Sequence, residues 1–137
     1  VPMLSARCVS RPDPAALKKK TERWQKIALE AAKQSGRGII PQVGSTIDIS
    51  KIPALISPEN TGILFYECAE TSLREAVGEF TRNIDIVIGS EGGFEQSEAE
   101  KLIAAGLKCA SLGKRILRCE TAPIAAISVL MNMTGNM

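Results

Sequence analysis

The sequence has 137 residues, of which 45% are hydrophobic, and a formal net charge of +2 at pH 7. This length suits one domain with a core of its own. No apolar run approaches the ~20 residues that a membrane-spanning helix needs, and no secretory leader is recognisable at the start. The composition therefore predicts a soluble globular domain and excludes a membrane partner.

Few residues are available for metal binding or nucleophilic catalysis. The four cysteines, Cys8, Cys68, Cys109 and Cys119, lack the paired spacing of a metal motif, and there is no histidine. We therefore predict no metal site and interpret the cysteines as free thiols in a reducing cytoplasm. Without histidine, Ser-His-Asp and Cys-His catalysis are also excluded, so proton chemistry must use carboxylates, Tyr66, lysine or arginine.

One long amphipathic pattern dominates the first part of the chain. Residues 1–9 predict a short strand that runs into a loop, and the Arg-Pro-Asp-Pro segment after them is a breaker. Apolar residues then recur with a period near 3.6, which predicts a helix over 15–35 that ends at the following glycines. Trp24 on this helix is either a core anchor or a platform for a stacked base, and its spacing favours the core.

Two shorter elements are predicted next. Residues 38–43 indicate a short strand. Residues 45–56 indicate the start of a second helix, with Asp48 or Ser50 near its N-cap and Pro53 in its first turn. A turn then leads into the second half of the chain.

The second half alternates strands and helices. The predicted strands cover 62–67, 84–89 and 108–113, and the predicted helices cover 71–80, 97–105 and 121–133. Thr71 or Ser72 is expected to cap the first of these helices, and Ser97 with Glu100 forms a capping-box pattern for the second. Apolar strands that alternate with helices are typical of a parallel sheet covered on both faces. The predicted fold class is therefore α/β, a parallel sheet flanked by helices.

The turns after the three strands are unusual. The first strand ends at Glu67, the second runs into Gly-Ser-Glu-Gly-Gly (89–93), and the third runs into Ser-Leu-Gly-Lys-Arg (111–115). Ligands of parallel α/β sheets bind beyond these strand ends, and glycine lets the backbone approach a ligand closely. None of these turns matches the dinucleotide fingerprint or the phosphate loop. Glu91 would repel a phosphate but suits a hydroxyl, an amine or a sulfonium.

Two motifs together resemble one known family. The segments Ile-Gly-Ser-Glu-Gly-Gly-Phe (88–94) and Ser-Leu-Gly-Lys-Arg-Ile-Leu-Arg-Cys-Glu-Thr-Ala (111–122) are similar to the paired C-terminal motifs of the RsmE family. Residues 3–9 and the segment from 22 are also similar to that family. Its members are SPOUT-class methyltransferases that methylate N3 of a uridine in small-subunit (16S) ribosomal RNA. The resemblance implies this activity, with S-adenosylmethionine as cofactor and ribosomal RNA or the assembled small subunit as partner.

The resemblance also implies an architecture. Residues 1–137 would form a SPOUT methyltransferase domain with a deep trefoil knot, in which residues 108–133 thread under the loop that carries the glycine motif. The family is dimeric, so a homodimer is expected. The family's N-terminal PUA-like domain and the first strand and helix of its catalytic domain are expected to be absent here. Ser90 stands where proline is common in the family, a mild change that frees an N–H.

Site residues follow by matching positions. For the cofactor, the resemblance implies Leu64, Tyr66, Glu67, Gly89, Glu91, Gly92, Gly93, Leu112, Gly113, Ile116, Leu117, Arg118, Thr121 and Ala122. For catalysis, Arg118 or Arg7 is expected to stabilise a uridine anion, and Glu91 or Glu120 is a less favoured base. Glu120 is otherwise interpreted as a cap of the last helix. The residues expected to contact RNA are Arg11, Lys18, Lys19 and Arg23, although such a cluster also suits a solvated helix face.

Two other functions remain as alternatives. The chain could be a non-catalytic module for dimerisation and S-adenosylmethionine binding within a larger RNA-modifying protein. It could also be an ordinary Rossmann-like nucleotide enzyme, which the missing fingerprint disfavours and which would bind NAD or ATP instead. The apolar helix at 121–133 fits either a core or a dimer interface.

Overall fold

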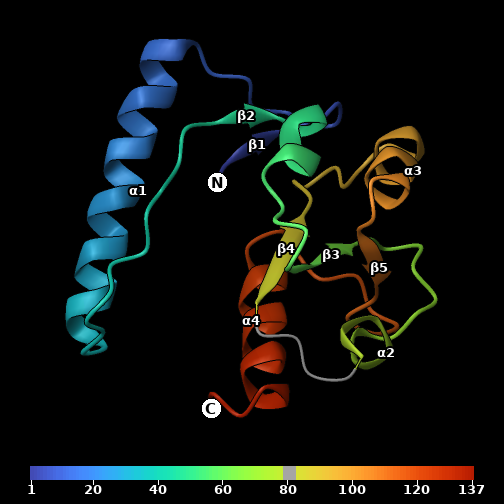
Figure 1. Ribbon diagram of the computed structural model, residues 1–137. Coiled ribbons are helices and arrows are strands. Elements are labelled where there is room, and N and C mark those ends of the chain that lie inside the picture. Colours follow the sequence, from blue (N-terminus) through green and yellow to red (C-terminus); the bar gives the residue numbers. More distant parts are fainter. Residues whose placement is uncertain (79–82) are drawn as a thin grey trace. The chain divides into compact units, whose positions relative to one another are not determined.

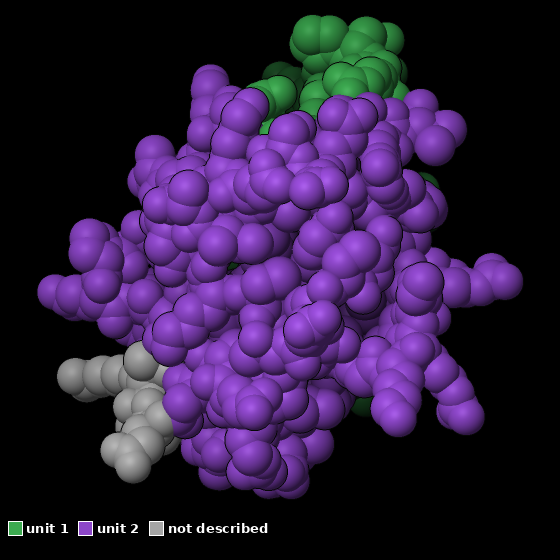
Figure 2. Space-filling model, turned by 90° about the vertical axis from the view of Figure 1, so that its right-hand side faces the viewer, with its two compact units in different colours: residues 1–4, 10–49 green, residues 5–9, 50–137 purple. Residues whose placement is uncertain are grey.

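The computed structural model describes residues 1–78 and 83–137, which divide into two compact units. Unit 1 comprises residues 1–4 and 10–49, and unit 2 comprises residues 5–9 and 50–137 (Figure 2). The elements in chain order are β1 (Met3–Leu4), α1 (Pro14–Gln34), β2 (Ile47–Asp48), the 3-10 helix η1 (Ile49–Ala54), β3 (Thr61–Phe65), α2 (Leu73–Val77), β4 (Ile84–Ile88), α3 (Gln96–Ala104), β5 (Lys108–Ala110) and α4 (Thr121–Met133) (Figure 1).

The predicted long helix is confirmed as α1 in unit 1. Its start is set by Asp13, whose side chain accepts a hydrogen bond of 2.8 Å from the N–H of Ala16, and by Pro14 at the first helical position. The helix ends just before Gly36, which has a φ of 65°. Local sequence therefore fixes both ends of this element.

The prediction that Trp24 anchors a core is wrong. Trp24 is 37% exposed and Ile27 is 55% exposed, and Ala32 is the buried residue of α1. Within unit 1, the helix is joined by hydrogen bonds to a single extended segment: Gln25 donates to the carbonyl of Pro41 and accepts from the N–H of Val43. One extended segment provides too little surface to cover a large aromatic side chain.

The elements predicted between 38 and 56 differ from those observed. Residues 38–43 form no strand, because this segment bonds to the Gln25 side chain and contains Pro41, which has no N–H for a sheet. A strand lies instead at β2, which pairs in parallel with β1. The second helix is the short 3-10 helix η1, and Pro53 lies near its end rather than in its first turn.

Unit 2 contains a three-stranded parallel sheet in the order β4-β3-β5, which confirms the predicted α/β class. All five residues of the central strand β3 are buried. Apolar side chains of α2 and α4 pack on one face of the sheet, in a cluster that includes Ile63, Phe65, Ala110, Ala126 and Leu130. Helix α3 lies on the other side (Figure 1), so both faces are covered.

The helix caps in unit 2 agree only in part with the sequence. Ser72, one of the two predicted caps, caps α2, and it also forms a capping box with Glu75 that was not predicted. Residues 79 and 80 of that predicted helix lie outside the described residues. The Ser97–Glu100 capping box is wrong. Helix α3 begins at Gln96, and it is Glu98 whose carboxylate accepts the N–H of Glu95, at 3.0 Å.

The strand order determines where a ligand can bind. The chain leaves β3 through α2 to reach β4 on one side, and leaves β4 through α3 to reach β5 on the other side of β3. The carboxyl end of β3 is therefore a point at which the chain connections diverge, and such points open a crevice in parallel sheets. No helix among the described residues is both long and apolar enough to cross a lipid bilayer.

Candidate functional site

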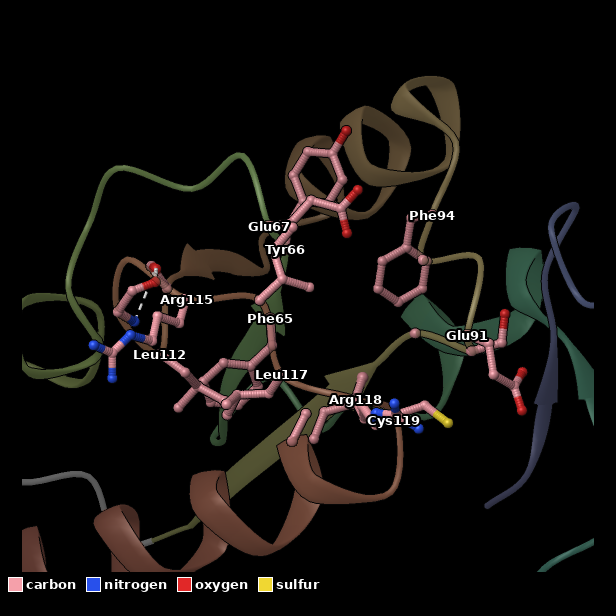
Figure 3. A pocket seen from close by; sticks show the side chains of 18 of the residues that line it. Phe65, Tyr66, Glu67, Glu91, Phe94, Leu112, Arg115, Leu117, Arg118 and Cys119 are labelled. Atoms are coloured by element: carbon pink, nitrogen blue, oxygen red, sulfur yellow. Dashed lines mark hydrogen bonds between the residues drawn. The ribbon is translucent and has the colours of Figure 1, made fainter.

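A pocket of about 460 Å³ lies in unit 2 at the carboxyl ends of β3, β4 and β5. Its walls are the three turns that follow these strands and the start of α4 (Figure 3). The residues that line it are Phe65, Tyr66, Glu67, Ile88, Gly89, Ser90, Glu91, Gly93, Phe94, Ala110, Ser111, Leu112, Gly113, Lys114, Arg115, Ile116, Leu117, Arg118, Cys119, Glu120 and Ala122. The volume is within the range of pockets that hold small-molecule ligands.

The glycine turn after β4 folds tightly on itself. The N–H of Gly93 donates to the carbonyl of Ser90 at 2.9 Å, and Gly93 has a φ of 66°. A Cβ at Gly89 would lie 3.1 Å from the Cα of Gly93 and 3.2 Å from the ring of Phe94. Glycine at 89 and 93 therefore lets the turn close over the buried Phe94.

The third glycine of this turn packs against Arg7. A Cβ on Gly92 would lie 2.7 Å from the carbonyl oxygen of Arg7 and 2.8 Å from its Cβ. The Nη1 of Arg7 also donates to the carbonyl of Gly92, at 3.5 Å. The glycines of this motif thus serve contacts within unit 2, in addition to the pocket that Gly89 and Gly93 line.

Glu67 joins the end of β3 to the glycine turn. Its Oε2 would lie 2.9 Å from a Cβ on Gly93, so the carboxylate rests directly against that residue. Figure 3 shows Glu67 beside Tyr66 on the same rim of the pocket, with Phe94 and Glu91 along the next wall. Glu67 and Glu91 are both exposed, and their carboxylates are available to a ligand.

The loop after β5 brings cationic residues to the pocket. Ser111 holds this loop through its hydroxyl, which accepts the N–H of Gly113 and lies 3.1 Å from the carbonyl of the same residue. Lys114, Arg115 and Arg118 follow and line the pocket. Arg115 lies on the opposite side of the pocket from Glu91, and Arg118 lies between them (Figure 3).

Cys119 and Glu120, adjacent side chains that line the pocket, have shifted pKa values. The thiol of Cys119 donates a hydrogen bond to Oε2 of Glu120 at 3.2 Å, which raises the pKa of Cys119. The pKa of Glu120 is lowered, mainly because its carboxylate accepts from its own backbone N–H. Glu120 occupies the N-cap position of α4, as interpreted from the sequence, although its side chain makes no cap hydrogen bond.

Tyr66 and Arg7 lie close together at the rim. A hydrogen bond with Cys68 raises the pKa of Tyr66, and the positive charge of Arg7 opposes that shift. Arg7 does not line the pocket itself, but its bond to Gly92 holds it against the glycine turn, other residues of which do. The structure thus brings the candidate catalytic residues Arg7, Arg118, Glu91 and Glu120 to one region of unit 2.

Most of the predicted cofactor residues line the pocket, and three do not. Leu64 is fully buried in the sheet, because alternate residues of a strand point to opposite faces and only the end of β3 reaches the pocket. Gly92 faces Arg7 rather than the pocket. Thr121 is exposed at the first position of α4, while its neighbour Ala122 lines the pocket.

Several lining residues were missed by sequence reasoning. They are Phe65, Ile88, Ser90, Phe94, Ala110, Ser111, Lys114 and Cys119. Phe65, Ile88 and Ala110 are the last residues of their strands. Ligands of parallel sheets bind at the carboxyl ends of the strands, so applying this rule to each predicted strand could have found them. Ser90 carries a further signal: its Oγ is buried and has no hydrogen-bond partner among the described residues.

The predicted RNA-contacting residues are all exposed. Lys18, Lys19 and Arg23 lie on α1, and Arg11 precedes it. They belong to unit 1, whereas the pocket belongs to unit 2. Across residues 1–78 and 83–137, no group of three or more His, Cys, Asp or Glu side chains is placed to hold a metal ion.

The family model for the RNA methyltransferase domain matches residues 1–131 of the sequence. The chain therefore belongs to the RNA methyltransferase domain family. This match covers both units and the whole lining of the pocket.

Individual relatives and solved structures agree with this assignment. Ribosomal RNA small subunit methyltransferase E of Bacillus subtilis is 35% identical over 98% of this chain and 55% of the relative. The enzyme of the same name from Aquifex aeolicus is 33% identical over 96% of this chain and 56% of the relative. The chain thus spans about half the length of the curated relatives it matches.

Two similar structures contain the same small molecule. The Neisseria gonorrhoeae ribosomal RNA small subunit methyltransferase E, bound to S-adenosyl methionine, has a TM-score of 0.86 and 32% identity over 96% of this chain and 53% of its own. A Legionella pneumophila methyltransferase in complex with the bound cofactor SAM has a TM-score of 0.89 and 29% identity, over 96% of this chain and 54% of its own.

Proposed function

We propose that this chain is the catalytic part of an S-adenosylmethionine-dependent methyltransferase that acts on N3 of a uridine in small-subunit (16S) ribosomal RNA. One observation carries the proposal: the glycine turn and the Arg-Ile-Leu-Arg loop, which are separate in the sequence, wall a single pocket at the carboxyl ends of the sheet, through Gly89, Ser90, Glu91 and Gly93 and through residues 115–118. The non-catalytic alternative leaves the cationic side of this pocket without a use, so we do not favour it.

The pocket suits S-adenosylmethionine chemically. This cofactor carries a cationic sulfonium, an amine and ribose hydroxyls, all of which are favourably placed near carboxylates such as those of Glu67 and Glu91. The apolar lining from Phe65, Leu112 and Leu117 suits a purine ring. The residues proposed to hold the cofactor are the predicted ones that line the pocket: Tyr66, Glu67, Gly89, Glu91, Gly93, Leu112, Gly113, Ile116, Leu117, Arg118 and Ala122.

The bound cofactor supplies an electrophilic methyl group, and the protein must present a deprotonated uridine N3 to it. We assign Arg118 and Arg7 to stabilising the uridine anion, because both carry permanent positive charge at the pocket or its rim. We assign proton acceptance to Glu91, whose carboxylate is exposed on the pocket wall. Holding the two reactants in line supplies much of the remaining acceleration, roughly 7–11 kcal/mol in favourable cases.

The proposed RNA contact uses unit 1. Arg11, Lys18, Lys19 and Arg23 are exposed and cationic, which suits the phosphate backbone of ribosomal RNA or of the assembled small subunit. Binding through these residues should weaken steeply as salt is added. We expect the reaction to take place in the cytoplasm, where ribosomal subunits are assembled.

The finer architecture is proposed from the same family. Residues 1–137 would form the SPOUT methyltransferase domain, with residues 108–133 threaded under the loop at 89–93 to give a trefoil knot. The pocket supports this, because both segments line it. Stretching the unfolded chain from its two ends tests the threading: a knotted chain stops short of the ~3.6 Å per residue of full extension, whereas an unknotted chain reaches it.

A homodimer is proposed on the exposed apolar residues of α4 and the loop before it. Ile116 is 83%, Ile124 69% and Ile127 47% exposed. An apolar surface of this kind typically marks a protein interface. Sedimentation of the protein should give twice the mass of one chain, and replacing Ile124 by lysine should give the single-chain mass.

Methyl transfer to isolated small subunits tests the proposed function. Tritiated S-adenosylmethionine should label the RNA of subunits that lack the modification, at N3 of a uridine. Arg118→Ala should lower turnover by about a hundredfold or more, while the Kd for S-adenosylmethionine changes far less. Calorimetric titration should show one site for S-adenosylmethionine and none for NAD. Two outcomes contradict the proposal. One is labelling with the protein that does not exceed labelling in a control without it, and the other is binding of NAD instead of S-adenosylmethionine.

A further inference from the structure

The loop formed by residues 5–9, here called the N-terminal loop, is tied to the glycine turn. The backbone of Arg7 packs on Gly92, at 2.7 Å from a Cβ built there, and Nη1 of Arg7 donates to the carbonyl of Gly92. The loop also has its own internal bonds, from the N–H of Cys8 to the carbonyl of Ser5 at 3.2 Å and from the N–H of Ser5 to Sγ of Cys8. It is therefore an ordered loop pressed against one wall of the pocket.

Glu98 forms a bridge between this loop and α3. Its Oε1 accepts the N–H of Ala6 at 2.7 Å, and its Oε2 accepts the N–H of Glu95 at 3.0 Å. Hydrogen bonds to an ionised carboxylate are short and about twice as strong as neutral ones. The Glu98 side chain is half-buried and does not line the pocket. It thus joins Ala6, the residue next to Arg7, to the start of α3.

We propose that Glu98 is a positioning residue: by holding Ala6 against α3 it fixes the adjacent Arg7 over Gly92, beside the methyl-transfer pocket. The inference rests on the proposed function, because it gives Arg7 a role toward the target nucleotide. Glu98 does not contact the pocket, so it acts through Arg7 rather than on the reacting atoms. Arg7 is exposed, and besides this bridge it is held by the packing of its backbone on Gly92, by its long hydrogen bond to the Gly92 carbonyl and by the bonds between Ser5 and Cys8.

Glu98→Gln is the informative change. An amide has one acceptor oxygen, so the variant keeps the side-chain shape but can accept from only one of the two N–H groups. The matched control is Glu100→Gln on the same helix, which removes the same charge from a carboxylate that bonds to Gln96. Both are combined with Arg7→Ala in a double-mutant cycle on the full protein, with small ribosomal subunits as substrate.

We expect Glu98→Gln to lower kcat by about tenfold with the Kd for S-adenosylmethionine within about twofold, and Glu100→Gln to leave both unchanged. In the Arg7→Ala background, Glu98→Gln should lower kcat by less than about twofold. The amide of Ala6 should exchange with solvent faster in Glu98→Gln than in the unaltered protein. Additive losses in the cycle, or unchanged exchange at Ala6, overturn the positioning role. No turnover by the unaltered protein overturns the proposed function instead, and the exchange result still decides whether the bridge exists.

Discussion

Glu67 and Gly93 are in direct contact: a Cβ placed on Gly93 would lie 2.9 Å from Oε2 of Glu67. These residues come from turns after two different strands, β3 and β4, which pair in parallel. The contact closes one corner of the pocket and places a carboxylate against a residue with a φ of 66°.

Comparing Gly93→Ala with Gly36→Ala should separate two losses in the free energy of unfolding: the one from placing alanine at a positive φ and the one from its contact with Glu67. Placing a residue with a Cβ in the left-handed region destabilises the folded state by roughly 1–2 kcal/mol. Gly36 has nearly the same φ, 65°, but nothing within 4 Å of its Cβ position, so Gly36→Ala measures the backbone cost alone. Because the end of the Glu67 side chain can move away, we expect similar losses in the free energy of unfolding for both variants. Binding of S-adenosylmethionine should weaken for Gly93→Ala only, which calorimetry measures.

Gly92→Ala should behave differently, since the atoms it would meet belong to backbone. The carbonyl oxygen of Arg7 lies 2.7 Å from the Cβ position and cannot move without the N-terminal loop. We expect a loss of about 1–3 kcal/mol in the free energy of unfolding by urea denaturation. Gly38→Ala is the control: Gly38 has open space and no positive φ, so a gain of about 0.4–1 kcal/mol is expected. Equal effects of the two changes would contradict the close contact.

Ser90→Ala should stabilise the protein. The Ser90 hydroxyl is buried and has no hydrogen-bond partner among the described residues, and burying such a group costs about 1–3 kcal/mol. Alanine removes the hydroxyl and keeps the backbone N–H. We expect a gain of about 1 kcal/mol in the free energy of unfolding, seen as a higher Tm. A lower Tm would mean that the hydroxyl bonds to an ordered water or a ligand.

The reactivity of Cys119 should depend on Glu120. The hydrogen bond to Glu120 raises the thiol's pKa, so at a given pH less of the reactive thiolate is present. Glu120→Gln removes the negative charge and should lower the pKa, which moves the onset of alkylation by iodoacetamide to lower pH. Peptide mass spectrometry from pH 7 to 10 follows the rate, with the exposed Cys68 in the same sample as reference. Identical pH profiles for Cys119 in both proteins would rule out this coupling.

Local sequence determined the elements whose signals are local. Asp13 and Pro14 start α1, and Ser72 caps α2. The apolar runs at 61–65 and 84–88 become paired parallel strands, the first buried and the second mostly half-buried. The position of the pocket also followed, because ligands bind where parallel strands end. Most of the residues that the family motifs predicted to hold the cofactor line this pocket.

Tertiary packing decided the rest. Whether Trp24 is covered depends on what faces α1, and within unit 1 that is one extended segment. Glu98, and not Glu100, caps the start of α3, and its second oxygen is taken by Ala6, 92 residues away in the chain. The glycines of the 89–93 turn are required by Arg7, Phe94 and Glu67, partners that no local pattern identifies. Hydrogen bonds and close contacts between distant segments depend on the fold as a whole. The sequence alone therefore indicates which residue types are available, whereas the tertiary structure determines which residues interact.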